Sequence, residues 1–120
     1  MQVEALDHVQ LAMPAGGEPA ARAFYTGILG IPERAKPAPL AARGGVWFER
    51  GALKVHLGVE QNFVPARKAH PAFIVRDLAA LAARLREAGH DVTEDHTPQG
   101  QRQIYTADPF GNRLEFLEST

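Results

Sequence analysis

The sequence predicts an α+β fold of two βαβββ modules, whose strands form an open, cup-shaped mixed sheet with the helices on its outer face. Three observations lead to this prediction. Apolar and polar residues alternate in short segments typical of strands, two segments have the apolar spacing of helices, and both halves repeat the same order of elements. The length of 120 residues fits one domain over 1–120, with modules over 1–60 and 69–118.

The first module opens with a predicted strand over residues 3–12, where polar and apolar residues alternate from His8 to Leu11. A helix follows, because Pro19 suits a first helical turn and Gly30 is a typical terminator after the last residue of the apolar spacing. The proline-rich stretch after this helix is predicted as a loop. Three strands with glycine turns between them complete the module, over residues 39–43, 46–50 and 53–59.

The second module repeats this order. A predicted strand over residues 69–76 precedes a helix that Asp77 caps and Gly89 ends, with leucines and alanines at helical spacing between them. Asp108 opens a tight turn that contains proline, glycine and asparagine. Three strands complete this module as well, over residues 91–95, 101–107 and 113–118.

Four polar residues fall at equivalent positions of the repeat. His8 and His70 are predicted in the first strand of each module, and His56 and Glu115 in the last. The strand period of two places all four on the face opposite the helices, inside the cup. Three imidazoles and one carboxylate are suitable ligands for one divalent zinc, nickel, manganese, iron or cobalt ion, which would offset the cost of burying them unpaired.

Taken singly, each of these residues has a plainer interpretation, as a hydrogen-bonded or solvated strand residue. Their shared positions in a repeat favour the metal site. The other two histidines, His90 and His96, have no such partners and are interpreted as surface residues. Candidate substrate contacts lie on or close to the ligand-bearing face: Gln10, Trp47, Lys54, Gln103, Tyr105 and Arg113.

Composition excludes several classes of function. The net charge of −1 and the lack of a basic block argue against nucleic acids and anionic membrane surfaces as partners. The absence of cysteine excludes disulfides and thiolate metal sites. The N-terminal residues lack the pattern of a signal peptide, and no apolar run is long enough to span a bilayer. We therefore expect a cytoplasmic protein that acts on a small molecule.

Several segments resemble the vicinal-oxygen-chelate superfamily, which comprises glyoxalases, bleomycin resistance proteins and dioxygenases. The opening DHVQL of residues 7–11 is similar to its first strand, and AFYTGILG of residues 23–30 to its first helix end. HPAF of residues 70–73 resembles the start of its second module. The most specific segment is DPFGNRLEF of residues 108–116, and the resemblance spans essentially the whole chain.

The resemblance implies a metal-dependent lyase, isomerase or transferase whose substrate chelates the ion through adjacent oxygens. It places the metal ligands at His8, His56, His70 and Glu115, and Glu115 and His56 become the candidate catalytic residues. It also implies a homodimer, in which the first module of one chain and the second module of its partner share each site.

The sequence also departs from particular members of the family. Where glyoxalase I has an arginine and an asparagine that bind glutathione, this chain has Ala12 and Glu60, and His56 stands where that enzyme often has a glutamate ligand. Fosfomycin resistance enzymes use a threonine at the position of Gln10. The substrates of these two enzyme types are therefore not predicted for this chain.

Three alternatives stay open. An extradiol-type dioxygenase would hold iron with His8, His70 and Glu115 and use His56 as an acid or base. A protein of the bleomycin resistance type would bind a small molecule or antibiotic without catalysis. A metal ion could also have a purely structural role.

Overall fold

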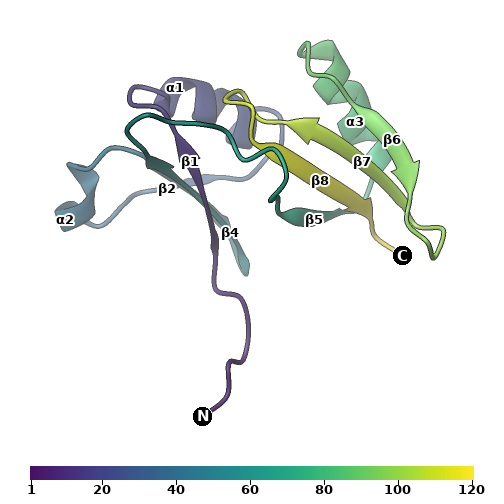
Figure 1. The fold of residues 1–120 in the computed structure, drawn as a ribbon, viewed down its shortest axis with the longest axis horizontal. Coiled ribbons are helices and arrows are strands. Elements are labelled where there is room, and N and C mark those ends of the chain that lie inside the picture. Colours follow the sequence, from purple (N-terminus) through teal and green to yellow (C-terminus); the bar gives the residue numbers. More distant parts are fainter. The chain divides into compact units, whose positions relative to one another are not determined.

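The computed structural model describes residues 1–120, which divide into two compact units, Met1–Phe63 and Val64–Thr120. Each unit contains one four-stranded mixed sheet together with helical segments (Figure 1). This arrangement confirms the predicted α+β class and the repetition of one module. None of the helices has the length and apolar character needed to cross a bilayer.

The first unit has four strands in the order β1-β4-β3-β2, with β1 parallel to β4 and the other neighbours antiparallel. Its elements along the chain are β1 (Val9–Met13), α1 (Glu18–Ala21), the π-helical turn η1 (Arg22–Thr26), β2 (Glu33–Arg34), α2 (Ala38–Ala41), β3 (Val46–Arg50) and β4 (Leu53–Val59).

The second unit repeats this topology, with strand order β5-β8-β7-β6 and β5 parallel to β8. Its elements are β5 (Ala72–Val75), α3 (Leu78–Glu87), β6 (Thr93–His96), β7 (Arg102–Ala107) and β8 (Arg113–Glu118). Each strand of the first unit therefore has an equivalent in the second, which is the relationship that the order of predicted elements indicated.

One face of each sheet is covered by helix. In the first unit, Tyr25 of η1 stacks on Phe48 of β3 with ring centroids 5.2 Å apart, and both side chains are fully buried. In the second unit, α3 contacts β7 and β8 and buries its leucines. Burying a large apolar side chain contributes roughly 1.5–3 kcal/mol. The Asp77 side chain accepts a hydrogen bond from the Ala80 N–H, which confirms the predicted cap.

The predicted strand over residues 39–43 is wrong. This segment forms the short helix α2, and the missing strand of the module is β2, within the stretch predicted as a loop. Pro37 and Pro39 explain the difference, because proline fixes φ near the helical value and has no N–H to donate to a sheet. Gly44 and Gly45, both at positive φ, then turn the chain into β3.

The first strand of each unit also starts later than predicted, so that His8 and His70 lie just before β1 and β5 rather than within them. In the first unit, the pairing of β1 with β4 begins with Val9 opposite Val55, so His8 directly precedes the first paired residue. In the second unit, Pro71 follows the histidine and cannot donate a ladder hydrogen bond, although its carbonyl accepts one from the Glu115 N–H.

Candidate functional site

Three rings lie one on another on the helix-free face of the first sheet. The register of β3 and β4 places Trp47 beside His56, and their rings are nearly parallel, with centroids 4.1 Å apart and planes 6° apart. The ring of His8 stacks on His56 as well, at 4.4 Å and 23°. The structure therefore brings the first predicted ligand pair together, with Trp47 as an apolar wall beside it.

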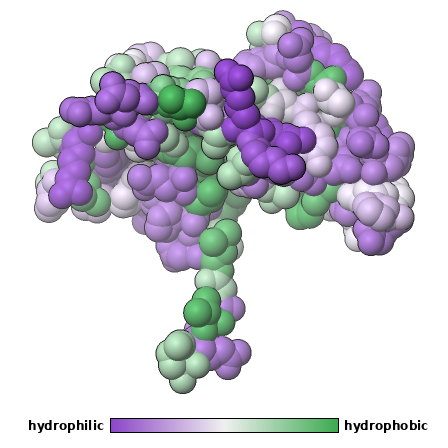
Figure 2. All heavy atoms as spheres, viewed as in Figure 1, coloured by the Kyte–Doolittle hydropathy of each residue, from purple (hydrophilic) through white to green (hydrophobic).

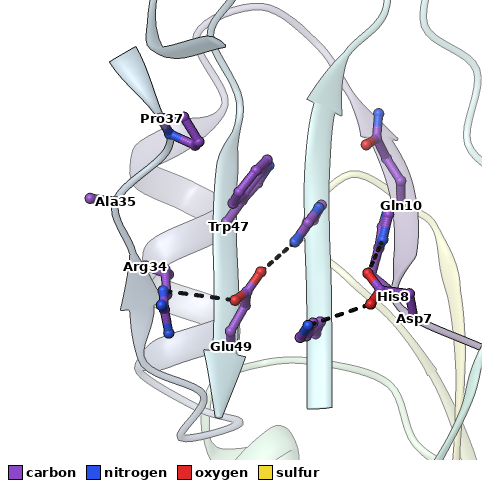
Figure 3. A pocket seen from close by; sticks show the side chains of 10 residues that line it. Asp7, His8, Gln10, Arg34, Ala35, Pro37, Trp47 and Glu49 are labelled. Carbon is purple, nitrogen blue, oxygen red and sulfur yellow. Dashed lines mark hydrogen bonds and ion pairs between the residues drawn. The ribbon is translucent and has the colours of Figure 1, made fainter. Parts of the chain in front are cut away.

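A carboxylate that the sequence did not reveal contacts this stack. Oε2 of Glu49 lies 2.6 Å from Nε2 of His56, and the two side chains are only 12% and 7% exposed. A carboxylate oxygen accepts hydrogen bonds, so this contact is satisfied when Nε2 carries the proton. The guanidinium of Arg34 lies on the other side of Glu49, with Nε 3.9 Å from Oε1 (Figure 3).

His8 has its own carboxylate partner in Asp7. The Nδ1 atom of His8 lies 2.9 Å from Oδ2 of Asp7, and Nζ of Lys54 lies 3.5 Å from the other carboxylate oxygen. The hydrogen bond from His8 and the charge of Lys54 lower the pKa of Asp7. A carboxylate accepts hydrogen bonds, so the Nδ1–H of His8 donates in this contact, and Nε2 is the ring nitrogen that this contact leaves for a ligand.

A cavity of about 510 Å³ lies over this face of the first sheet (Figure 3). The predicted contacts Gln10, Trp47 and Lys54 all line it, together with His8 and His56. Its other lining residues are Asp7, Arg34, Ala35, Pro37 and Glu49. The lining carries two lysine or arginine cations and two carboxylates, so the cavity suits a polar molecule with an aromatic or planar part against Trp47.

In the second unit, the structure pairs the other two predicted ligands. Nε2 of His70 lies 2.9 Å from Oε1 of Glu115, and Nδ1 of His70 lies 2.8 Å from the carbonyl oxygen of Lys68. The carbonyl only accepts, so Nδ1 carries a proton and Nε2 faces the carboxylate. This is the usual arrangement of a metal-binding histidine, with one ring nitrogen fixed by a backbone carbonyl and the other directed at the ligand site.

The remaining predicted contacts surround Glu115. The amide Nε2 of Gln103 donates to Oε2 of Glu115 at 3.0 Å and also lies 3.3 Å from the Tyr105 hydroxyl. Gln103 is buried, at 8% exposure. The guanidinium of Arg113 lies over the Tyr105 ring, 4.4 Å from its centroid. Gln103 therefore orients the carboxylate, while Arg113 is held beside it by the aromatic ring.

The two pairs occupy equivalent positions of the two sheets. In the first unit, His56 of the last strand pairs with Gln10, and His8 lies two residues before Gln10. In the second unit, Glu115 of the last strand pairs with Ala72, and His70 lies two residues before Ala72. The adjacent antiparallel strand places an aromatic residue beside each ligand, Trp47 in β3 and Tyr105 in β7. The equivalence predicted from the order of elements is thus present in the hydrogen-bond register.

The donor types suit a divalent metal ion, although the structure gathers no three His, Asp or Glu side chains into a group that could hold one. Each unit supplies one pair of ligand types. In the second pair, the lone pair of His70 Nε2 and the carboxylate of Glu115 face each other, so a cation is needed between them, either a proton or a metal. This contact is the feature that fits a metal best.

Glu49 and Arg34 were not predicted as site residues, because the pairing of strands brings them to the site. Glu49 reaches His56 because β3 runs antiparallel to β4 with Trp47 opposite His56, which puts Glu49 on the same face two residues along. Arg34 belongs to β2, a segment predicted as a loop, and pairs with Trp47. Neither residue carries a local signal, since an isolated glutamate or arginine in a sequence is most often solvated.

Comparison with known families and structures agrees with this architecture. The family profile of the Glyoxalase/Bleomycin resistance protein/Dioxygenase superfamily matches residues 5–116. The crystal structure of a glyoxalase family protein from Bacillus anthracis is 45% identical, superposes with a TM-score of 0.93, and the match covers 100% of this chain and 98% of that one. The comparison with curated proteins gave no match.

More distant solved structures share the fold alone. A lactoylglutathione lyase from Agrobacterium tumefaciens is 23% identical with a TM-score of 0.72, over 98% of this chain and 96% of that one. A fosfomycin resistance protein from Listeria monocytogenes is 19% identical with a TM-score of 0.78, over 99% and 96% of the two chains. Their different activities show that this fold does not by itself specify a substrate.

Proposed function

Because the chain belongs to the Glyoxalase/Bleomycin resistance protein/Dioxygenase superfamily, we propose that it is a metal-dependent enzyme whose site unites His8, His56, His70 and Glu115. The observation that carries this proposal is the contact between His70 Nε2 and Glu115 Oε1, 2.9 Å apart, at the position equivalent to the pair in the first unit. Two imidazoles from one unit and an imidazole and a carboxylate from the other make a complete ligand set.

A divalent ion bound by these residues would act as a Lewis acid toward a substrate that offers two adjacent oxygens. The residues of the chain have separate tasks. Glu115 and His56 are the candidates to accept or return a substrate proton, and Gln103 holds Glu115 in place. The Trp47 ring provides a flat wall for the substrate, and Lys54 lies in the same cavity, where it can attract an anionic group.

The first test is the metal content of the purified protein beside His8→Ala and Glu115→Gln variants, with His96→Ala as the control, since His96 is exposed at the end of β6. We expect about one tightly held divalent ion per chain in the wild type and the control, and loss of the ion in both site variants. Wild-type protein that stays metal-free after incubation with zinc, nickel, manganese or anaerobic ferrous iron would contradict the proposal.

We further propose a homodimer in which each site combines the first unit of one chain with the second unit of its partner. Residues 1–7 support an intermolecular contact, because this exposed segment extends beyond β1 and carries Val3 and Leu6 at 87% and 83% exposure (Figure 2). Ile74 of β5 is also 65% exposed. Covering these side chains with a partner chain would remove apolar surface from water, which favours association.

Mixing two inactive variants tests whether sites are shared. A dimer of one His8→Ala chain and one Glu115→Gln chain has one doubly substituted site and one intact site if each site spans both chains. Co-refolding the two variants should then restore metal binding to about one quarter of all sites, because half of the dimers are mixed and each has one intact site. No restoration in a sample that contains mixed dimers would place each site within a single chain.

A second candidate is a binding protein that needs no metal and performs no catalysis. The cavity of about 510 Å³ favours it, because residues of the first unit alone line this space and include the Trp47 ring.

An extradiol-type dioxygenase is a third candidate. The hydrogen bond between Glu49 and His56 favours it, because His56 would then act as an acid or base beside a metal held by the other three residues. Oxygen consumption by the ferrous protein with a catechol would identify the third candidate.

A further inference from the structure

The three histidines of the candidate site differ in the ring nitrogen that is bonded. Nδ1 of His8 lies 2.9 Å from a carboxylate, and Nδ1 of His70 lies 2.8 Å from a backbone carbonyl. His56 has the opposite arrangement, with Nε2 lying 2.6 Å from Glu49. Nε2 of His70 also lies 2.9 Å from Glu115, which is itself a candidate ligand. His56 differs from the other two histidines because a residue outside the candidate ligand set, Glu49, contacts its Nε2 rather than its Nδ1, and a ring nitrogen that donates a hydrogen bond leaves the lone pair on the other nitrogen.

The surroundings of His56 hold this arrangement in place. Its ring is enclosed between Trp47 and His8, at centroid distances of 4.1 Å and 4.4 Å, so the ring plane is fixed. The side chains of His56 and Glu49 are 7% and 12% exposed, which leaves little water to compete for the bond. Rotating the ring to exchange its two nitrogens would leave Glu49 without this donor.

Glu49 has no equivalent in the second unit. The strand registers align Trp47 with Tyr105, and two residues further along, Glu49 aligns with Ala107. The repeat therefore does not require a carboxylate at this position. Only the first unit has a glutamate at this position. In that unit the candidate ligand on the last strand is an imidazole, His56, whereas in the second unit it is a carboxylate, Glu115.

We propose that Glu49 is a positioning residue that acts through His56, by accepting the Nε2–H and thereby making Nδ1 the nitrogen that binds the metal or accepts a proton. This inference rests on the proposed function for its role in the site, but the tautomer that it assigns to His56 can be measured without metal. A hydrogen-bonded carboxylate fixes the tautomer and orientation of an imidazole and raises its basicity, and losing such a partner costs metal affinity about 10–100-fold.

The first experiment records long-range ¹H–¹⁵N correlations of the imidazoles in metal-free, full-length protein at pH 8, with His56 assigned by comparison with His56→Gln. We expect a protonated Nε2 and an unprotonated Nδ1 in the wild type. Glu49→Ala should lose this preference, and Glu49→Gln should keep it, because the amide oxygen still accepts. A proton on Nδ1, protons on both nitrogens, or an unchanged pattern in Glu49→Ala would overturn the proposal.

The second experiment measures the affinity of the same proteins for zinc by competition with a chelating dye. Glu49→Ala should bind zinc at least about tenfold more weakly than the wild type, and Glu49→Gln should recover most of that loss. The matched control is Glu33→Gln, which removes the same charge from the neighbouring strand β2. Glu33 pairs with Phe48 of the buried face and bonds Arg22. Equal losses in Glu33→Gln and Glu49→Ala would refute the assigned role.

The outcomes separate this inference from the proposed function. Wild-type protein that binds no metal would remove the proposed function, whereas the tautomer of His56 and its dependence on Glu49 would still be decided by the first experiment. Thermal unfolding of each variant verifies that a lost signal does not come from loss of the fold. If Glu49→Ala does not fold, the comparison of wild type with Glu49→Gln and Glu49→Asp still decides the tautomer, because the shorter aspartate should not reach Nε2.

Discussion

Nε2 of His70 and Oε1 of Glu115 lie 2.9 Å apart, although both atoms are acceptors in the neutral ring whose Nδ1–H donates a hydrogen bond to the Lys68 carbonyl. Two acceptors at this distance need a cation between them. The side chains are 23% and 13% exposed, so solvent screens them only in part. A proton or a metal ion can supply that cation, and the predictions about the second unit follow from the proposal that a metal ion does.

Gln103 should control the geometry of Glu115. Replacing it with leucine removes the hydrogen bond to Oε2, and we expect the affinity for zinc to fall about 10–100-fold while the protein stays folded. Isothermal titration calorimetry measures this change. As a control, Gln101→Leu removes a glutamine whose amide instead bonds the Glu118 carbonyl. An unchanged affinity in Gln103→Leu would show that Glu115 needs no support from this residue.

Trp47 should report on the site directly, because it is the only tryptophan of the chain and its ring lies on His56. Loading the protein with zinc should change the intensity of tryptophan emission. The change should be lost in His56→Ala and kept in His96→Ala. A change of equal size in His56→Ala would mean that the metal affects Trp47 by another route and would argue against His56 as part of the site.

The turn before β8 should contribute strongly to the stability of the second unit. Asp108 is 4% exposed, and its side chain accepts hydrogen bonds from the backbone of Phe110 and Asn112 and from the Asn112 amide. Asp108→Ala should lower the free energy of unfolding by about 3 kcal/mol, because it leaves buried donors unpaired. Urea denaturation measures this, with the exposed Asp91→Ala as the control, and equal effects of the two variants would contradict the assignment.

Glu18 should make stability depend on pH. Its Oε2 accepts a hydrogen bond from the Gly45 N–H at 2.8 Å, and this bond lowers the pKa of Glu18 below the ordinary value of 4.5. A lowered pKa in the folded state contributes stability above the unfolded value, and this contribution is lost as the pH falls through the folded pKa. Glu18→Gln should therefore cost about 1 kcal/mol near pH 7, and progressively less below about pH 4.

Measuring the free energy of unfolding of both proteins between pH 3 and pH 7 tests the prediction for Glu18. The control is Glu87→Gln, at an exposed position of α3, which should show no such trend. A loss of stability in Glu18→Gln that stays constant over this range would assign the effect to packing rather than to the charge of the carboxylate.

The sequence predicted those elements whose signals are local. Strands β4 and β8 have the predicted bounds, because residues alternate along them between glycine or asparagine turns. The helix of the second module was likewise evident from its leucine spacing and the Asp77 cap. The strand predicted over residues 39–43 was wrong because a segment forms a strand only where a neighbouring strand can pair with it. The two-residue strand β2 was missed because it is too short to show an alternating pattern.

The candidate site was likewise predictable only in part. The pairing of His8 with His56 and of His70 with Glu115 could be predicted, since each pair follows from an equivalence along the chain. The role of Glu49 could not, because it depends on which residue of β3 lies opposite His56 and on the direction in which the imidazole faces. Register and side-chain orientation are set by packing between strands rather than by local sequence.

The most direct test of the central claim is a crystal structure of the zinc-loaded protein with anomalous data collected at the zinc edge. We expect one strong anomalous peak per chain, about 2.0–2.2 Å from imidazole nitrogens of His8, His56 and His70 and from a carboxylate oxygen of Glu115. The ligand nitrogen of His56 should be Nδ1. A peak bound by only one of the two pairs, or zinc held by residues outside this set, would contradict the claim that the two units build one metal centre.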